Sequence, residues 1–390
     1  MKKFSTYLLV FLVLLLSACG GDDGLESTDD KTLVDQDQDQ TTMTLDSNYV
    51  YQLPVIFHVL YQNASDENQY IPATRLKNIL QYVNEIFKGG AYGESANVNI
   101  NFVLAETDES GKTLSTPGVE YVNYTGEYPI DPMTFMSDNT GKNTKYIWDP
   151  NDYINVVLFN FKSSDGTNGE TLGVSHMPVS FNDDTALEGL ETTTLRYISK
   201  ASLRYAHCSA INSLYAGRDE QGGYYQSSRY TNGILNGYTI SPYDIVVTIA
   251  HELGHYLGLF HMFTDDLNSS GAEPVDSCGD TDYCKDTPSY NRKEYNDYLT
   301  YYEATQGSQA RLEDVIVRHA CDGTEFYSAN IMDYAYTLGY KLSAGQKERV
   351  RHVLYYSPLI PGPKRNSATT RTRGGKEADS PVDFRPVIIR

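Results

Sequence analysis

Three histidines lie within eleven residues of this 390-residue chain, at positions 251, 255 and 261. On a helix, His251 and His255 lie one turn apart on the same face, so their imidazoles can converge on one metal ion. Glu252 follows the first histidine, where its carboxylate can reach a metal-bound water rather than the metal. Gly258 can adopt the backbone angle that ends a helix and turns the chain, which brings in His261 as a third ligand. Three protein ligands with an open fourth position are typical of a catalytic zinc site, not a structural one.

This pattern predicts a specific division of chemical roles. Neutral imidazole nitrogens bind zinc at about 2.0–2.1 Å, and the bound ion lowers the pKa of its water to about 7 and polarises a carbonyl group. We expect one zinc ion on His251, His255 and His261, and we expect Glu252 to act as the general base. The alternative is a surface helix that is rich in histidine by chance. It is weak because the full spacing fixes five positions.

A second motif lies about 70 residues downstream, where residues 330–334 read NIMDY. Together with the histidine segment, it resembles the metzincin metallopeptidases, whose zinc helix is followed by a tight turn with a methionine beneath the metal. The NxMDY form and the GDTDYCKDTP segment at 279–288 are similar to the pappalysin-like branch. With its N-terminus included, the chain looks most like the zinc-dependent metalloproteinase lipoproteins of Bacteroidetes. The resemblance covers roughly residues 50–356.

This resemblance implies further roles, a fold and an activity. Met332 would form an apolar floor under the histidines without binding the metal. The Tyr334 hydroxyl would stabilise a tetrahedral oxyanion, although Tyr334 is also one of 33 tyrosines, any of which can be a plain core residue. The implied fold is α/β (α+β) and metzincin-like, with a mixed twisted sheet, an active-site helix and an irregular C-terminal subdomain ending in a helix. The implied activity is that of a zinc endopeptidase acting on protein or peptide. The alternative is a non-catalytic surface binding or adhesion protein on the same scaffold, which has little reason to keep Glu252.

The N-terminus predicts the cellular compartment. Lys2 and Lys3 precede an apolar run at 7–16, which is too short to span a membrane and has the layout of a signal peptide. Small residues before Cys19 fit a lipoprotein signal, so we expect residues 1–18 to be removed and Cys19 to be lipidated; an ordinary secretory signal is the alternative. Residues 19–48 are rich in Asp, Gln and Thr and predict a disordered acidic tether. We therefore expect a protein of the bacterial cell envelope, held by Cys19 in the outer membrane and exposed at the surface.

Composition and cysteine content fit this compartment. The net charge of −20 argues against nucleic acid as a partner. We expect residues 49–360 to form one monomeric catalytic domain, with subdomains at 49–261 and 262–360. Apart from Cys19, an even number of cysteines in an oxidising compartment suggests two disulfides, and the sequence leaves all three pairings open. These cysteines are Cys208, Cys278, Cys284 and Cys321.

An acidic stretch follows the zinc helix and suggests a second ion. Asp280, Asp282 and Asp286 offer the hard oxygen ligands that calcium prefers. The resemblance to calcium-binding pappalysins supports this interpretation, whereas the spacing is not that of an EF-hand. A solvated acidic loop is the alternative.

Hydrophobic periodicity predicts the elements that position these residues. We expect strands at 50–61, 98–104, 153–161 and 172–179, and helices at 72–88, from Ser241 through the histidines, and at 342–356. In metzincins a strand placed like 172–179 forms the upper edge of the cleft, and an extended peptide pairs with it. His58 and His176 lie in two of these strands and are interpreted as structural. Residues 180–240 predict an insertion that is partly helical at 195–214, and residues 361–390 predict a flexible tail.

Overall fold

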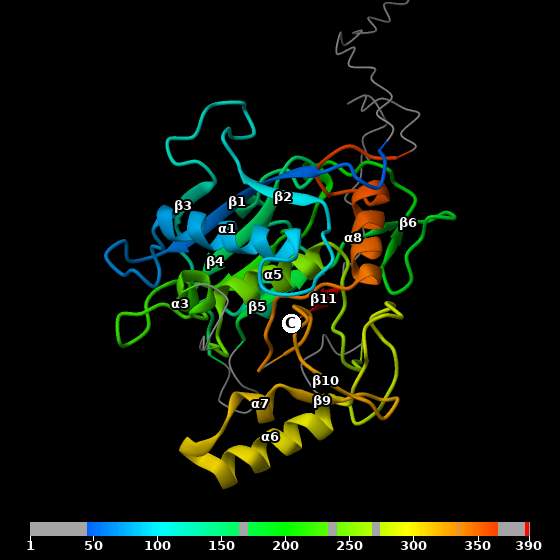
Figure 1. The fold of residues 1–390 in the computed structure, drawn as a ribbon. Helices are drawn as coiled ribbons and strands as arrows, with labels where there is room; N and C mark the ends of the chain where they lie inside the picture. The colour runs from blue at the N-terminus through cyan, green and yellow to red at the C-terminus, as the bar shows by residue number, and fades with distance from the viewer. Residues whose placement is uncertain are drawn as a thin grey trace, which may run out of the picture. The chain divides into compact units, whose positions relative to one another are not determined.

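The computed structural model describes residues 45–163, 171–232, 240–266, 274–334, 336–365 and 387–389 (Figure 1). All of these belong to one compact unit, residues 42–390. The expected signal peptide, Cys19 and most of the expected tether lie outside the described residues. Within the described ranges, no helix combines the length and the apolar character needed to cross a bilayer.

A mixed sheet forms the centre of the described unit, with strand order β11-β5-β8-β4-β1-β2 and with β3 also paired to β1. Strand β1 pairs in parallel with β2, β3 and β4, and β4 pairs in parallel with β8. Strand β5 runs antiparallel to both of its neighbours, β8 and β11. The strands are β1 (Tyr51–Tyr61), β2 (Ile100–Leu104), β3 (Val119–Asn123), β4 (Ile154–Phe159), β5 (Gly173–His176), β8 (Ser209–Asn212) and β11 (Ile388–Ile389).

Helix α1 (Ala73–Lys88) shows why the periodic segments were predictable. Pro72 precedes its first turn, and Gly89 ends it with a φ of 71°, which glycine adopts without strain. Its apolar stripe is buried in the same core as alternate residues of β1 and as helix α5 (Ile245–Tyr256), which carries His251 and His255. Each fully buried aliphatic side chain contributes roughly 1.5–3 kcal/mol. Helices α1 and α5 therefore cover one face of the sheet together (Figure 1).

The opposite face of the sheet carries a second core, built by α2 (Pro132–Ser137) and by the chain around residues 195–206. His58 of β1 is buried and bonds to Glu120 Oε2 at 2.7 Å and to Asn155 Oδ1 at 2.9 Å. His176 of β5 is buried as well, with Nε2 3.1 Å from the Met136 carbonyl. These contacts agree with the structural interpretation of both histidines.

The prediction of a partly helical insertion at 180–240 is wrong in its central part. Residues 195–214 contain a short 3-10 turn, η2 (Lys200–Ser202), then β8, which is a strand of the main sheet, and the first two residues of the short helix α3 (Ser213–Ala216). All four residues of β8 are buried, so the segment shows no apolar–polar alternation that would mark it as a strand. The remaining short elements are β6 (Ser180–Phe181), β7 (Thr192–Thr193) and α4 (Arg229–Asn232).

The part of the chain after α5 is less irregular than expected. It contains α6 (Arg292–Gln306), η3 (Gly307–Gln309), α7 (Leu312–Val315), and the antiparallel pair β9 (Val317–His319) and β10 (Glu325–Tyr327). Its last helix, α8 (Ala344–Tyr356), begins at a capping box formed by Ser343 and Gln346. The expected fold class is confirmed: a mixed sheet, an active-site helix and a C-terminal part with a final helix. Within the tail expected to be flexible, Ile388 and Ile389 form β11.

Candidate active site

Helix α5 carries the histidine segment and begins one turn later than expected. Its N-cap is Asp244, whose Oδ1 accepts a hydrogen bond from the Val246 amide at 3.0 Å, so Ser241 lies outside the helix. Ile245, Val246 and Ile249 are fully buried and hold the helix against the sheet. Almost every residue of α5 is buried, and the position of the histidines is therefore fixed by the core.

The three histidines converge as the spacing predicts. Nε2 of His255 lies 2.9 Å from Nε2 of His251 and 3.1 Å from Nε2 of His261. The chain turns back after α5 because Gly258 adopts a φ of 94°. A Cβ at Gly258 would also lie 2.7 Å from Val353 Cγ2, so both the angle and the space require glycine. Within the described residues, these histidines are the one group whose arrangement suits a metal ion.

The outer nitrogen of each histidine is Nδ1, which faces away from the other two rings. It donates a hydrogen bond, and this fixes the tautomer. His251 Nδ1 donates to the Ile331 carbonyl at 2.6 Å, and His255 Nδ1 donates to the Leu259 carbonyl at 2.7 Å. His261 Nδ1 donates to Asp265 Oδ2, also at 2.7 Å. The lone pairs of the three Nε2 atoms therefore face one centre, as in metal-binding histidines with hydrogen-bonded outer nitrogens.

This donor set fits zinc. Burial lowers the pKa of His251 to about 4 and holds the pKa values of His255 and His261 well below their usual range, so all three rings are neutral. Neutral rings with facing lone pairs repel one another unless a cation lies between them. The Nε2–Nε2 distances of 2.9 and 3.1 Å are close to the roughly 3.3 Å expected between two nitrogens of a tetrahedral zinc site.

Glu252 directly follows His251 on α5, and its carboxylate is buried. It is 3 % exposed, and its Oε2 has no hydrogen-bond partner among the described residues. Burial raises the pKa of its carboxyl well above the usual range. Gly173, the first residue of β5, lies against it: a Cβ there would be 2.5 Å from Glu252 Oε1. The start of β5 therefore lies against the Glu252 side chain, a contact that the expected strand at 172–179 did not specify.

Met332 lies against helix α5 between His251 and His255, as the resemblance implied. Its side chain is fully buried, and its sulfur occupies the space beside Gly254, where a Cβ would come within 2.6 Å of Sδ. The turn is closed by Asn330, whose Oδ1 accepts from the Met332 amide at 2.9 Å. Gly254, between the first two histidines, is therefore required by Met332 and not by helix geometry.

Tyr334 lies beside the histidines. Its ring centroid is 4.5 Å from that of His261 and 5.6 Å from that of His251. The guanidinium of Arg292 lies 5.3 Å from the centre of the Tyr334 ring. The neighbouring Asp333 is turned away into structure, because it accepts from the Tyr290 hydroxyl and from Ser328 and pairs with buried Arg318.

The cysteines form one disulfide, so the expectation of two is wrong. Cys278 and Cys321 are joined, with 5.5 Å between their Cα atoms. Cys208 and Cys284 are free thiols in the interior. Cys208 lies in the second core just before β8, and its sulfur contacts that of Met136. The even number of cysteines suggested two disulfides, but it could not show that two of the four cysteines are ordinary buried side chains.

The three aspartates proposed as calcium ligands each serve the loop or a helix end. Asp280 Oδ1 accepts from the amides of Asp282 and Tyr283 at 3.2 Å. Asp282 accepts from Cys284 N and Thr287 Oγ1, and burial raises its pKa to about 7. Asp286 accepts from Ser343 Oγ at 2.7 Å and from the Gly345 amide at 2.8 Å, at the N-terminus of α8. These contacts provide no support for calcium beyond the resemblance.

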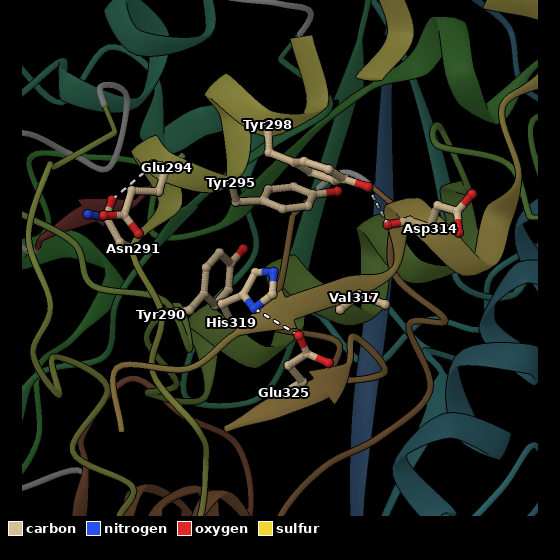
Figure 2. Close-up of a pocket in the computed structure, with 9 residues that line it drawn as sticks. All are labelled: Tyr290, Asn291, Glu294, Tyr295, Tyr298, Asp314, Val317, His319 and Glu325. Atoms are coloured by element: carbon tan, nitrogen blue, oxygen red, sulfur yellow. Dashed lines mark hydrogen bonds and ion pairs between the residues drawn. The ribbon is translucent and has the colours of Figure 1, made fainter. Parts of the chain in front are cut away.

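A separate hollow of about 230 Å³ lies in the C-terminal part, between α6 and the β9–β10 pair (Figure 2). Several tyrosine rings line it, and their hydroxyls already donate elsewhere, as Tyr295 does to the Val315 carbonyl at 2.7 Å. None of the zinc-site residues lines this hollow. The lining residues are Tyr290, Asn291, Glu294, Tyr295, Tyr298, Asp314, Val317, His319 and Glu325.

Comparison with known proteins supports the resemblance over part of the chain. Residues 226–355 match the family model described as pregnancy-associated plasma protein-A. This segment contains both the histidines and the methionine turn, and it confirms the predicted resemblance to the pappalysin-like branch.

Two fungal extracellular metalloproteases are also similar. The protein of Verticillium alfalfae is 28 % identical over 142 residues, which are 32 % of this chain and 49 % of that protein. The protein of Pyricularia oryzae is 30 % identical over 101 residues, which are 22 % of this chain and 36 % of that protein. The chain therefore spans half or less of the length of these curated relatives.

Two solved structures are similar at low identity. Mature mirolysin of Tannerella forsythia in complex with a cleaved peptide has a TM-score of 0.46 at 22 % identity, covering 77 % of this chain and 90 % of that chain. Mirolysin in complex with compound 9 has a TM-score of 0.48 at 23 % identity, covering 78 % and 92 %.

Proposed function

We propose that this protein is a zinc endopeptidase that hydrolyses protein or peptide substrates. The observation that carries the proposal is the convergence of the three Nε2 atoms, each on a ring whose Nδ1 is held by an acceptor. Glu252, buried next to His251 on α5, would supply a base, which a site that only stores zinc does not need.

The residues divide the reaction as follows. His251, His255 and His261 would hold the zinc ion, which when bound polarises the scissile carbonyl and acidifies water. Glu252 accepts a proton from the attacking water and returns it to the departing amine. Burial of the Glu252 carboxyl makes it a stronger base than an exposed one. Tyr334, whose ring lies beside that of His261, would donate a hydrogen bond to the oxyanion.

The cellular setting is part of the same proposal. We infer a monomer that is attached to the outer membrane through a lipid on Cys19, with residues 49–360 as the catalytic domain. The extracellular relatives agree with a location outside the cytoplasm. The second candidate, a surface binding or adhesion protein, gains nothing from a buried base beside three histidines.

The test is digestion of casein by the purified chain, with and without a zinc chelator. We expect the chelator to abolish cleavage. Glu252→Gln should lower turnover by a factor of about 10² or more while zinc content stays the same, because Glu252 is not a ligand. Glu348→Gln on the exposed side of α8 is the matched control and should cleave like the wild type. Cleavage that survives the chelator, or a fully active Glu252→Gln, would refute the mechanism, and a wild type without any cleavage would favour the binding protein.

A further inference from the structure

The outer edge of β5 is occupied by the chain itself. Strand β11 pairs antiparallel with β5, with Ile388 opposite His176 and Ile389 opposite Ser175. The Met177 amide donates to the Val387 carbonyl at 2.8 Å, which extends the pairing by one residue. All four residues of β5 are buried. The edge that was expected to receive an extended peptide is therefore covered by residues 387–389 (Figure 1).

This pairing leads toward the candidate base. Gly173, at the other end of β5, is in contact with the Glu252 side chain. Ile389 lies opposite Ser175, two residues from Gly173 and therefore about 7 Å away along the strand. Because β11 runs antiparallel to β5, it points from His176 toward Gly173. Any extended peptide that continues in this register passes Glu252, so residues 387–389 cover the part of the edge that precedes the reacting bond.

The side chains of this segment occupy apolar places beside β5. Ile389 is 4 % exposed and belongs to the same core cluster as Leu253 of the zinc helix. Val387 packs against that cluster too, whereas Ile388 packs against the core on the other face of the sheet. The edge therefore offers backbone pairing together with places for β-branched aliphatic side chains, which is the usual form of strand-addition sites.

We propose that residues 387–389 compete with the substrate for the outer edge of β5, and that this edge takes an extended peptide with an aliphatic side chain at the place of Ile389. The proposal rests on the proposed function, since it names the part of the same site that holds the peptide before its cleaved bond. Only a short ladder holds β11 in place. A substrate strand can therefore displace it, and peptide affinity is reduced by the fraction of chains in which the edge is covered.

Two proline variants separate backbone pairing from simple packing. Hydrogen-bonded and non-hydrogen-bonded pairs alternate in an antiparallel ladder. Because Met177 and Val387 form a bonded pair, Ile389 is the next residue whose N–H faces β5, and the N–H of Ile388 points away. Ile389→Pro removes a ladder bond, and Ile388→Pro is the matched control.

The affinity for a fluorescent peptide that contains Val-Ile-Ile is measured by fluorescence anisotropy. All chains are full-length and also carry Glu252→Gln. We expect Ile389→Pro to bind the peptide about tenfold more tightly, as for an edge that is nine-tenths covered, and Ile388→Pro to change affinity by less than about twofold. Replacing the peptide residue that matches Ile389 by Asp should abolish the gain. Equal affinity of both proline variants and their parent would overturn the proposal.

A second measurement does not depend on how the variants fold. Saturating peptide should speed hydrogen exchange in residues 387–389 of the Glu252→Gln chain, because the displaced strand loses its partner. Unchanged protection of these residues would overturn the competition. Casein digestion separates this outcome from the proposed function: chelator-sensitive cleavage with unchanged protection refutes only the competition. If peptide displaces β11 but the wild type cleaves no casein, only the proposed peptidase activity is refuted.

Discussion

Replacing Asp265 tests whether the protein tunes its metal site through the outer nitrogen of a histidine. Asp265 Oδ2 accepts from His261 Nδ1 at 2.7 Å, and the aspartate side chain is only 6 % exposed. The corresponding partners of His251 and His255 are backbone carbonyls, which no side-chain substitution removes. Asp265 is therefore the one outer partner of the three histidines that mutation can change.

The magnitude follows from the burial of the pair. Loss of such an outer partner usually lowers metal affinity by about 10-fold to 100-fold, which corresponds to about 1.4–2.8 kcal/mol. We expect Asp265→Asn to lie near the lower value, because the amide oxygen still accepts from His261 Nδ1 but carries no charge. Asp265→Ala leaves that nitrogen without its acceptor and should lie near the upper value.

Zinc affinity is measured by competition with a chromophoric chelator on the purified chains. Asp266→Asn is the matched control. Asp266 is exposed, and its substitution makes the same chemical change one residue away. The control should bind zinc as the wild type does. If Asp265→Asn and Asp265→Ala both keep wild-type affinity within about twofold, orientation of His261 by Asp265 contributes nothing measurable, and the turn at Gly258 alone positions the third ligand.

Two further predictions concern stability. Cys321→Ser opens a covalent loop of 43 residues and should lower the free energy of unfolding by up to about 4 kcal/mol; urea unfolding of both chains would contradict this if their midpoints agree. His176 is buried, and burial lowers its pKa from 6.5 to about 4. The contribution of the neutral His176 ring to the free energy of unfolding is therefore complete above pH 6.5 and is lost as the pH falls toward 4. Wild-type stability should therefore drop by about 2 kcal/mol more between pH 7 and pH 5 than that of His176→Gln, and parallel pH profiles would refute a neutral buried His176.

The convergence of the three histidines was predictable because its information is local. His251, His255, Glu252 and the turn at Gly258 lie in eleven consecutive residues, and helix geometry alone brings the first two histidines together. Met332 is distant in sequence, and only the resemblance placed it under the helix. Its contact with Gly254 shows the physical reason for a glycine between the histidines.

The partners of individual carboxylates after α5 were harder to predict from the sequence. Asp265 lies four residues after His261, and that spacing is a usable signal, but acidic neighbours made a cation-binding loop an equally natural interpretation. Asp286 was assigned to the same loop, although its carboxylate serves the N-terminus of α8. The charge was visible in the sequence, whereas the donor that each carboxylate accepts from depends on the folded chain.

Non-local pairing decides the elements that the sequence missed. β8 and β11 are short and almost wholly buried, so neither shows the alternation that marks a half-buried strand. Val387, Ile388 and Ile389 form an apolar triplet in a basic, polar tail, and such a triplet has no preferred partner of its own. It becomes a strand because β5 presents unpaired N–H and C=O groups, and an open strand edge next to a reactive centre accepts any extended chain within reach. Those same open groups make β5 suitable for a substrate, so its coverage by β11 and its use in binding are competing outcomes of one chemical property.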